Sequence, residues 1–228
     1  HNVIKSFKNA LADKAGFLVM KSNFFSTAIM KTSVISKEFR DRYLINPKHP
    51  NVFNGKAVVF EGPEDYHKRL NSKKLNIDEN SVLIVRGCGP VGYPGSAEVI
   101  NMQPPHRLLK KGVNTLPTLG DGRQSGTSAS PSILHVSPES AVGGDLGIVK
   151  TGDKIKIDLN KRRVDLLISQ SDFKSRRKRR KKFKINNQTP WQEIFRDTVG
   201  QLEDGACIKS RGVYLKVSTS KGIPRDSH

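Results

Sequence analysis

The sequence predicts an α/β fold rich in β-structure, either a mixed barrel or a sandwich with peripheral helices. Three observations support this class. Several short apolar runs, rich in β-branched residues, are bounded by Gly, Pro and Asn, which is typical of short strands. A regular alternation of strands and helices, as in doubly wound parallel sheets, is not visible. After Ser171 the chain becomes strongly basic, which predicts a helical carboxy-terminal extension beyond the β-rich part.

The expected elements follow the hydrophobic pattern along the chain. Residues 81–86 form the clearest strand, an apolar run between an asparagine and a glycine cluster. Residues 37–56, with prolines and asparagines, are expected as a surface excursion, and 160–162 as a hairpin turn. A short helix is expected over 64–70. The expected strands, in chain order, are 16–20, 57–60, 81–86, 146–150, 154–159 and 164–169.

Two helices are expected in the extension. Ser171 and Asp172 can cap a very basic helix, which the polar stretch 186–188 would end. Thr189 and Pro190 then start a second helix over 191–202, because a threonine cap followed by proline at the first helical position is a common beginning. The last residues, 218–228, are expected to form an extended tail.

The charge of the chain brings nucleic acid to mind as a partner. Lys and Arg number 40 against 21 acidic residues, a net charge of +19. Nine of these cations lie in residues 171–185. The run 176–182 could bind phosphates, but it has no aromatic platform beyond Phe173 and Phe183 and no recognition motif. Such a run is more often a solvated helix face, so a basic nucleic-acid-binding module stays an alternative and nucleic acid is not the expected partner.

Composition excludes several other classes of protein. The two cysteines, Cys88 and Cys207, lie far apart, so neither a disulfide framework nor a zinc site is indicated and a cytoplasmic setting fits best. No apolar run approaches the ~18 residues that span a bilayer, and no membrane association is expected. The six histidines show no spacing that would make a metal cluster.

Two glycine-rich stretches are the candidates for a site. Residues 87–92 satisfy G-x-G-x-x-G after a strand, but Pro90 and Pro94 interrupt the helix that a dinucleotide fold needs there. The alternative is a rigid turn that delivers Glu98 into a site. The second stretch, 120–130, places Ser125 between glycines and small hydroxyl residues, where backbone N–H groups can point at an anion.

These stretches resemble one protein family. Several segments of the chain are similar, in sequence and in order, to the carboxy-terminal domain of the dihydroxy-acid and sugar-acid dehydratase (IlvD/Edd) family. They are Arg86–Gly95, Glu98, Asn101–Pro105, Leu116–Ser128 and His135–Glu139, together with Asn23–Val34 and Phe60–Tyr66. Gln188–Glu193, Thr198–Leu202 and Gly205–Cys207 resemble its pentonate (arabinonate or xylonate) branch. The resemblance implies a β-rich swivelling-barrel domain over 16–170, a connector from a missing amino-terminal domain over 1–15, and a basic helix, second helix and tail over 171–228.

The resemblance also implies an activity and a set of site residues. A hydro-lyase of this family removes water from a sugar acid to give a 2-keto-3-deoxy acid. Ser125, as an alkoxide, would take the proton from C2, and Glu98 would be a ligand of Mg²⁺. Gly126 and Thr127 would help to bind the carboxylate, and His228 matches a terminal histidine that reaches the active-site entrance.

The resemblance further implies what the chain needs from elsewhere. An iron–sulfur cluster, expected as [2Fe-2S], would be held by cysteines of the amino-terminal dehydratase domain, since two scattered cysteines cannot hold it. The chain would then carry half an active site and be inactive alone. A homo-oligomer, dimer or tetramer, is expected. Within the enzyme class, the alternative substrate is the dihydroxy acid of branched-chain amino-acid synthesis.

Overall fold

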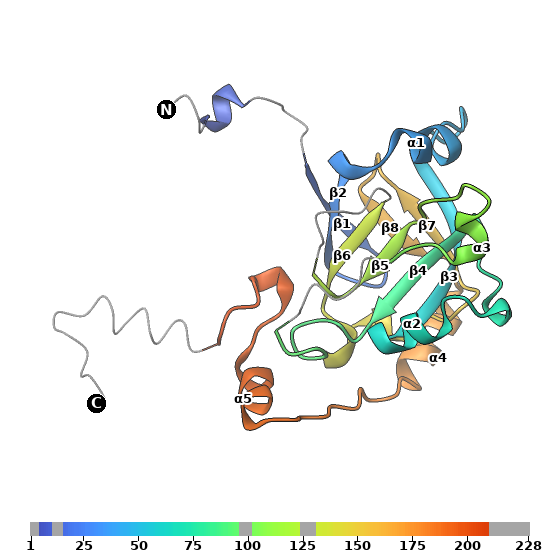
Figure 1. Ribbon diagram of the computed structural model, residues 1–228. Coiled ribbons are helices and arrows are strands. Elements are labelled where there is room, and N and C mark those ends of the chain that lie inside the picture. The colour runs from blue at the N-terminus through green and yellow to red at the C-terminus, as the bar shows by residue number, and fades with distance from the viewer. Residues whose placement is uncertain (1–4, 11–15, 96–101, 124–130, 210–228) are drawn as a thin grey trace.

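A closed barrel of eight strands is the centre of the part of the chain that the computed structural model describes, residues 5–10, 16–95, 102–123 and 131–209 (Figure 1). The strands are β1 (Phe17–Ser22), β2 (Thr27–Lys31), β3 (Val52–Glu61), β4 (Ser81–Arg86), β5 (Thr118–Gly120), β6 (Ser132–Ser137), β7 (Lys154–Asp158) and β8 (Arg163–Leu166). The α-helices are α1 (Lys37–Tyr43), α2 (Pro63–Arg69), α3 (His106–Leu109), α4 (Gln170–Lys178) and α5 (Pro190–Thr198). Short 3-10 turns are η1 (Phe7–Asn9), η2 (Thr32–Val34), η3 (Lys73–Leu75), η4 (Ser140–Val142), η5 (Asp145–Ile148) and η6 (Leu202–Asp204).

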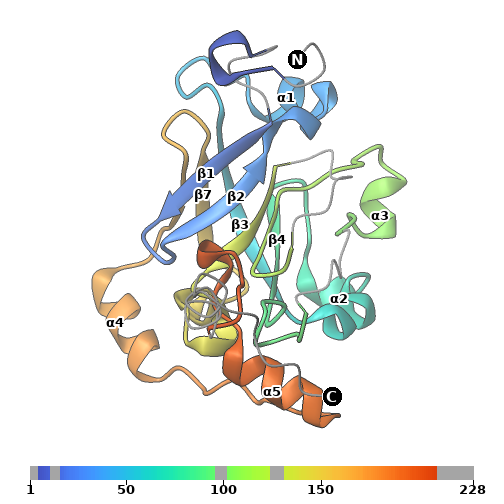
Figure 2. The same ribbon diagram turned by 90° about the vertical axis from the view of Figure 1, so that its left-hand side faces the viewer.

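The barrel mixes parallel and antiparallel strands. Its order is β1-β2-β6-β5-β4-β3-β7-β8, and β8 pairs with β1 to close it. Strands β3, β4, β5 and β6 are all parallel to one another, so their carboxyl ends lie at the same end of the barrel. Helix α1 lies at one end of the barrel and α4 and α5 lie toward the other, as two perpendicular views show (Figures 1 and 2).

Two hydrophobic clusters hold the domain together, one inside the barrel and one outside it. Alternation along β4 sends Val82 and Ile84 into the barrel and Leu83 and Val85 to the outer cluster. The outer cluster continues into α2 and α3. Because β4 is buried on both faces, its sequence is a continuous apolar run rather than an alternating one, as in parallel sheets covered on both sides.

The expected fold class is confirmed, and so are most of the expected strands. The strand expected over 81–86 is β4, and those expected over 16–20, 57–60, 154–159 and 164–169 fall within or overlap β1, β3, β7 and β8. The helix expected over 64–70 is α2. Residues 160–162 do connect the antiparallel pair β7 and β8, with Arg162 at φ 52°.

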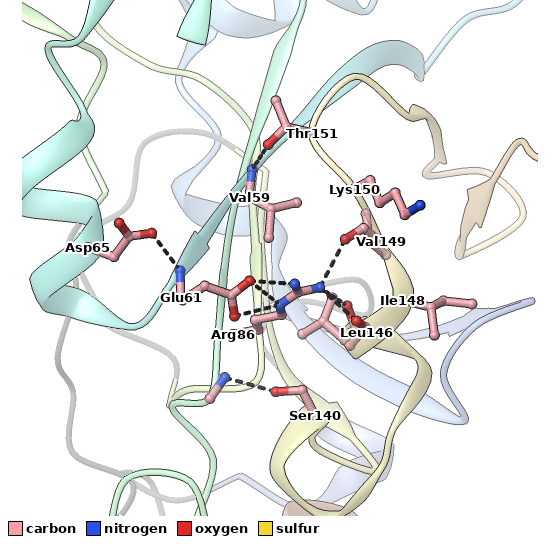
Figure 3. A network of polar contacts seen from close by, with 12 residues as sticks. Val59, Glu61, Asp65, Arg86, Ser140, Leu146, Ile148, Val149, Lys150 and Thr151 are labelled. Atoms are coloured by element: carbon pink, nitrogen blue, oxygen red, sulfur yellow. Dashed lines mark hydrogen bonds and ion pairs between the residues drawn. The ribbon is translucent and has the colours of Figure 1, made fainter. Parts of the chain in front are cut away.

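The strand expected over 146–150 is wrong, because this segment has another partner for its carbonyl groups. Arg86 donates through Nη1 to the carbonyl oxygens of Leu146, Gly147 and Val149, at 3.1, 2.9 and 2.9 Å. Figure 3 shows the Arg86 guanidinium between this segment and Glu61. The apolar run therefore packs as the 3-10 turn η5 and an irregular stretch instead of joining the sheet.

The segment 37–56, expected as a surface excursion, is exposed over most of its length, but it also contains a helix and the start of a strand. Ser36 caps α1, its hydroxyl oxygen accepting from the Phe39 amide at 3.1 Å, and Phe39 is buried. Strand β3 already begins at Val52 and buries Phe53 inside the barrel. Only the prolines and asparagines of 45–51 form the turn that the sequence indicated.

The two helices of the extension are shorter than expected. Ser169 rather than Ser171 caps α4, and the helix ends at Lys178 instead of continuing toward residue 185. Beyond it, residues 180–187 have no helical or strand structure. Thr189 caps α5 as predicted, with the Gln192 amide as donor, but the helix ends at Thr198 and not at Leu202. The chain then turns back, and Val199 pairs with Ile208 in an isolated antiparallel bridge.

Candidate functional site

The carboxyl ends of β4, β5 and β6 hold the two carboxylates that are completely buried among the described residues. The turn 87–95 follows β4, Asp121 follows β5, and Glu139 with Ser140 follows β6. Asp121 and Glu139 are both completely buried. Carboxyl ends of parallel strands are a common place for binding sites in α/β proteins, because loops from neighbouring strands meet there.

Asp121 ties the three strand ends together. Its Oδ1 accepts from the Cys88 amide at 2.8 Å, and its Oδ2 accepts from the Gly87 amide at 3.1 Å. The same Oδ2 also accepts from the amide and the hydroxyl of Ser140, at 2.9 and 2.6 Å. The Ser140 hydroxyl oxygen in turn accepts from the Gly87 amide at 2.9 Å. A buried carboxylate with four donors is stabilised by them and fixes the loops that supply them.

Glu139 fixes the far side of the glycine turn in the same way, by accepting hydrogen bonds. Its carboxylate accepts from the amides of Val91 and Gly92, both at 2.9 Å. Gln201 donates to it from Nε2 at 2.9 Å and accepts from the Glu139 amide at 2.8 Å. Burial raises the pKa of Glu139, while the three hydrogen bonds to its carboxylate oppose that rise. Since Gln201 follows α5, the extension is part of this site.

Each glycine of the 87–92 turn has a packing reason. Gly87 has φ 78°, and a Cβ there would lie 2.6 Å from the Phe183 ring. A Cβ on Gly89 would overlap the Glu139 carboxyl, and one on Gly92 would lie 2.7 Å from the Gly87 carbonyl oxygen. The described residues after this turn form further turns to 95 and no helix. The interpretation as a rigid turn, and not a dinucleotide loop, is therefore confirmed as far as residue 95.

Both ends of the serine loop are fixed. Gly120 ends β5, and the Gly122 carbonyl oxygen accepts from the His135 amide at 2.9 Å. On the other side, the Pro131 carbonyl oxygen accepts from the Thr118 amide at 2.9 Å. Because β5 and β6 are parallel, residues 120–123 lie at the carboxyl end of the pair beside His135, whereas 131–132 lie at its amino end beside Thr118. The predicted site residues Ser125, Gly126, Thr127, Glu98 and His228 lie outside the described residues.

Few described side chains beside the loop are suited to titrate or to hold a metal. Burial, with the charge of Arg123, lowers the pKa of His135, which favours the neutral imidazole. Burial raises the pKa of Cys88, so its thiol stays protonated. The described residues contain no group of three His, Cys, Asp or Glu side chains able to hold a metal ion. No described helix is long and apolar enough to cross a membrane.

Sequence reasoning missed most of this network. In the sequence, Asp121 is one residue of the glycine-rich stretch 120–130 and Glu139 ends a motif similar to the family, and neither has a predicted role. Ser140 and Gln201 had none. Arg196 in α5, which donates from Nε to the Val91 carbonyl oxygen at 2.7 Å, has no predicted role either. The one available signal was that these residues stand in or beside stretches similar to a known family, since contacts 19 to 105 residues apart leave no local pattern.

The fold and the site together define a closed α/β barrel with a buried carboxylate network at the carboxyl ends of its parallel strands. Residues 2–206 match a protein-family model described as "Dihydroxy-acid/6-phosphogluconate dehydratase C-terminal". The chain is a member of this dehydratase family and corresponds to its carboxy-terminal domain.

Its relatives include proteins named as sugar-acid dehydratases. The chain is 51% identical over 226 residues to a D-xylonate dehydratase of Caulobacter vibrioides, which covers 99% of the chain and 38% of the relative. It is 35% identical over 231 residues to an L-arabinonate dehydratase of Rhizobium leguminosarum, covering 100% and 37%. A dihydroxy-acid dehydratase of Thermodesulfovibrio yellowstonii is 34% identical over 211 residues, covering 91% and 36%. The chain therefore spans less than two fifths of the length of these relatives.

Proposed function

We propose that this chain is the carboxy-terminal part of a sugar-acid dehydratase that converts a pentonate such as D-xylonate to a 2-keto-3-deoxy acid. The observation that carries the proposal is the 51% identity to a D-xylonate dehydratase over nearly the whole chain. Identity to the dihydroxy-acid dehydratase is lower, at 34%, over a smaller share of the chain. The cytoplasmic location expected from the cysteine usage belongs to the same proposal.

Ser125 is the proposed base for the reaction. It removes the proton from C2 of the substrate while the hydroxyl leaves C3, and the resulting enol becomes the 2-keto-3-deoxy acid with release of one water. Gly126 and Thr127 supply hydrogen bonds to the substrate carboxylate, and His228 reaches the active-site entrance. The described geometry supports this assignment, because Asp121 fixes the start of the loop at the carboxyl end of β5, next to the glycine turn.

The described residues offer no suitable ligands for the Mg²⁺ ion or the iron–sulfur cluster of the proposal. Asp121 and Glu139 already accept several hydrogen bonds each and face amides, which does not fit a magnesium site. Cys88 is buried as a protonated thiol, which does not fit a cluster ligand. The proposal therefore keeps Glu98 as the Mg²⁺ ligand and assigns the iron–sulfur cluster to cysteines of an amino-terminal domain. When bound, these groups supply positive charge to the substrate carboxylate and to the leaving hydroxyl.

The partners of the chain follow from this assignment. An amino-terminal dehydratase domain completes the site, residues 1–15 connect to it, and the assembled enzyme is a homo-oligomer. The purified 228-residue chain alone is then expected to form no 2-keto acid from D-xylonate. Steady product formation without added cluster-bearing protein would contradict the proposed division of the site.

Substitution of Ser125 tests the proposed role. The enzyme assembled from this chain and its amino-terminal domain is reconstituted anaerobically with iron, sulfide and Mg²⁺, and 2-keto acid formation from D-xylonate is followed. We expect Ser125→Ala to lower kcat by about 10²–10⁴-fold, as loss of a general base does. The matched control is Ser128→Ala in the same loop, for which we expect less than about a fivefold change. Equal activity of the two variants would show that Ser125 is not the base.

A further inference from the structure

A basic pocket lies next to the site, between the barrel and the segment that follows α4. Its volume is about 650 Å³, within the range of small-molecule sites. Glu61, Arg86 and Lys150 are among its lining residues, and Figure 3 shows these three side chains. The opposite wall is residues 179–184, called here the basic segment, which runs without helical or strand structure except for the turn at its start.

Some of the cations around this pocket are already neutralised. Arg86 pairs with Glu61 at 2.5 Å, and Arg176 pairs with Asp153 at 2.5 Å. Arg177 and Arg180 both pair with Asp145. The pairs with Asp145 and Asp153 join α4 and the residue Arg180 beyond it to η5 and to the turn before β7, and the pair with Glu61 joins β4 to β3. These charges are therefore not available to a ligand at full strength.

Five further cations of the pocket have no carboxylate partner among the described residues. They are Lys150, Arg179, Lys181, Lys182 and Lys184. All five are exposed. Like charges brought this close repel one another, and an anion with several charges placed between them removes that repulsion.

The pocket also has an apolar part, formed by one aromatic ring and by buried side chains of η5. The partly buried Phe183 stands on Gly87, where the lack of a Cβ makes room for its ring. Ile148 and Val149 are buried beside it in the lining. Extended nucleic acid would need a continuous groove, whereas this is a single pocket of limited size.

We propose that this pocket binds a small anion carrying several phosphate groups, such as a nucleoside triphosphate or an inorganic polyphosphate. The lysines of the basic segment hold the phosphates, and Phe183 offers a face for an attached ring. Lys and Arg are the usual partners of phosphate oxygens in proteins. The described residues of the serine loop, 120–123 and 131, do not line this pocket, and its ligand does not depend on the proposed reaction.

The pocket is in direct contact with the carboxylate network. Ser140 lines the pocket and also donates its hydroxyl to Asp121 at 2.6 Å. Phe183 packs on Gly87, whose amide donates to the same carboxylate at 3.1 Å. A ligand that holds the basic segment against the barrel therefore also holds the glycine turn, which makes the pocket a candidate for regulation of the enzyme.

Calorimetric titration of the purified chain in 150 mM NaCl tests the proposal. Tripolyphosphate is the first probe, and ATP and a 20-base-pair DNA duplex are the others. We expect saturable one-to-one binding of tripolyphosphate to the wild type. In the double variant Lys181→Gln/Lys182→Gln we expect the Kd to rise by roughly tenfold or more, and each tenfold corresponds to about 1.4 kcal/mol of binding free energy. The matched control is Lys73→Gln/Lys74→Gln, two adjacent exposed lysines of η3, with less than about a twofold change. Circular dichroism checks that all variants are folded.

The outcomes separate the possible ligands. Tighter binding of ATP than of tripolyphosphate identifies a nucleoside triphosphate, and equal binding identifies the phosphate chain alone. Slower hydrogen exchange of residues 179–184 with tripolyphosphate, and unchanged exchange of residues 73–75, would place the ligand in the pocket. The proposal fails if binding does not saturate, if both double variants bind equally, or if the duplex binds more tightly than either small probe. Displacement of tripolyphosphate by D-xylonate would also overturn it, since the pocket would then belong to the substrate site.

Discussion

Replacement of Asp121 by alanine tests whether its carboxylate holds the site together. The substitution removes the acceptor of four hydrogen bonds, from the amides of Gly87, Cys88 and Ser140 and from the Ser140 hydroxyl. A buried donor left without a partner costs about 1–3 kcal/mol. The hydroxyl can rotate to another acceptor and water can enter the space, so we expect Asp121→Ala to lower the free energy of unfolding by about 4 kcal/mol, at the upper end of point substitutions.

The measurement is urea unfolding of the chain followed by circular dichroism, with extrapolation to zero denaturant. Asp121→Asn keeps one oxygen acceptor, so about 1–3 kcal/mol is expected for it. Asp41→Ala is the control, since Asp41 is exposed on α1, and its change is expected within about 0.5 kcal/mol. A loss below about 1 kcal/mol for Asp121→Ala, similar to that of the control, would refute the reasoning from the four donors.

Further substitutions test the glycine turn 87–92, the Glu139 carboxylate and the hydrogen bonds of the Arg86 guanidinium. Gly89→Ala would push a Cβ into the Glu139 carboxyl, and a loss of about 1–3 kcal/mol in urea unfolding is expected, whereas Gly147→Ala has an ordinary contact distance and should be nearly neutral. The raised pKa of Glu139 favours its protonated form in the folded state, so its contribution to stability is fully present below the unfolded pKa of about 4.3 and is lost as the pH rises through the folded pKa. The unfolding free energy of the wild type relative to Glu139→Gln should therefore be greater at pH 4 than at pH 7; a difference independent of pH would contradict this. A lysine at position 86 cannot bond to Glu61 and to three carbonyl groups together. We expect Arg86→Lys to lower the free energy of unfolding, measured in urea, by about 1–3 kcal/mol. An unchanged free energy of unfolding would show that these hydrogen bonds do not stabilise the domain.

Local sequence patterns predicted the strands that carry a complete hydrophobic signal. Strand β4 has six residues, five of them buried, and its bounds were predicted without error. Strand β5 has only three residues, Thr118–Gly120, too few to show any period, and it was not predicted as a strand. The apolar run over 146–150 looked like a strand, but its backbone carbonyls bond to the Arg86 side chain instead. Periodicity reports burial and not the hydrogen-bond partner.

The length of the basic helix α4 depends on acidic side chains that lie far from it in the sequence. In α4 and just beyond it, Arg176, Arg177 and Arg180 are neutralised by Asp153 and Asp145. The later lysines have no such acids among the described residues, and like charges at helical spacing are destabilising. Phe183 instead turns toward Gly87 and takes the chain away from the helix axis. These acids lie 23 to 35 residues upstream, so the sequence pattern could not show where the helix would end.

The candidate site was predictable only in part for the same reason. The composition of the glycine turn and of the serine loop marks both as candidates, and the structure brings the turn and the described start of the loop together through Asp121. The Glu139–Gln201 pair joins residues 62 positions apart, and its members look like ordinary polar residues in the sequence. The roles of Ser125, Glu98, Gly126, Thr127 and His228 stay predictions.

Substrate preference of the assembled enzyme is the most direct test of the central claim. The measurement is kcat/KM for D-xylonate and for 2,3-dihydroxyisovalerate, with the enzyme reconstituted anaerobically with iron, sulfide and Mg²⁺. A site built to hydrogen-bond several hydroxyl groups rejects an analogue that lacks them, so we expect D-xylonate to be preferred by about 100-fold or more. An equal or higher kcat/KM for 2,3-dihydroxyisovalerate would contradict the assignment to sugar acids and favour the branched-chain amino-acid enzyme instead.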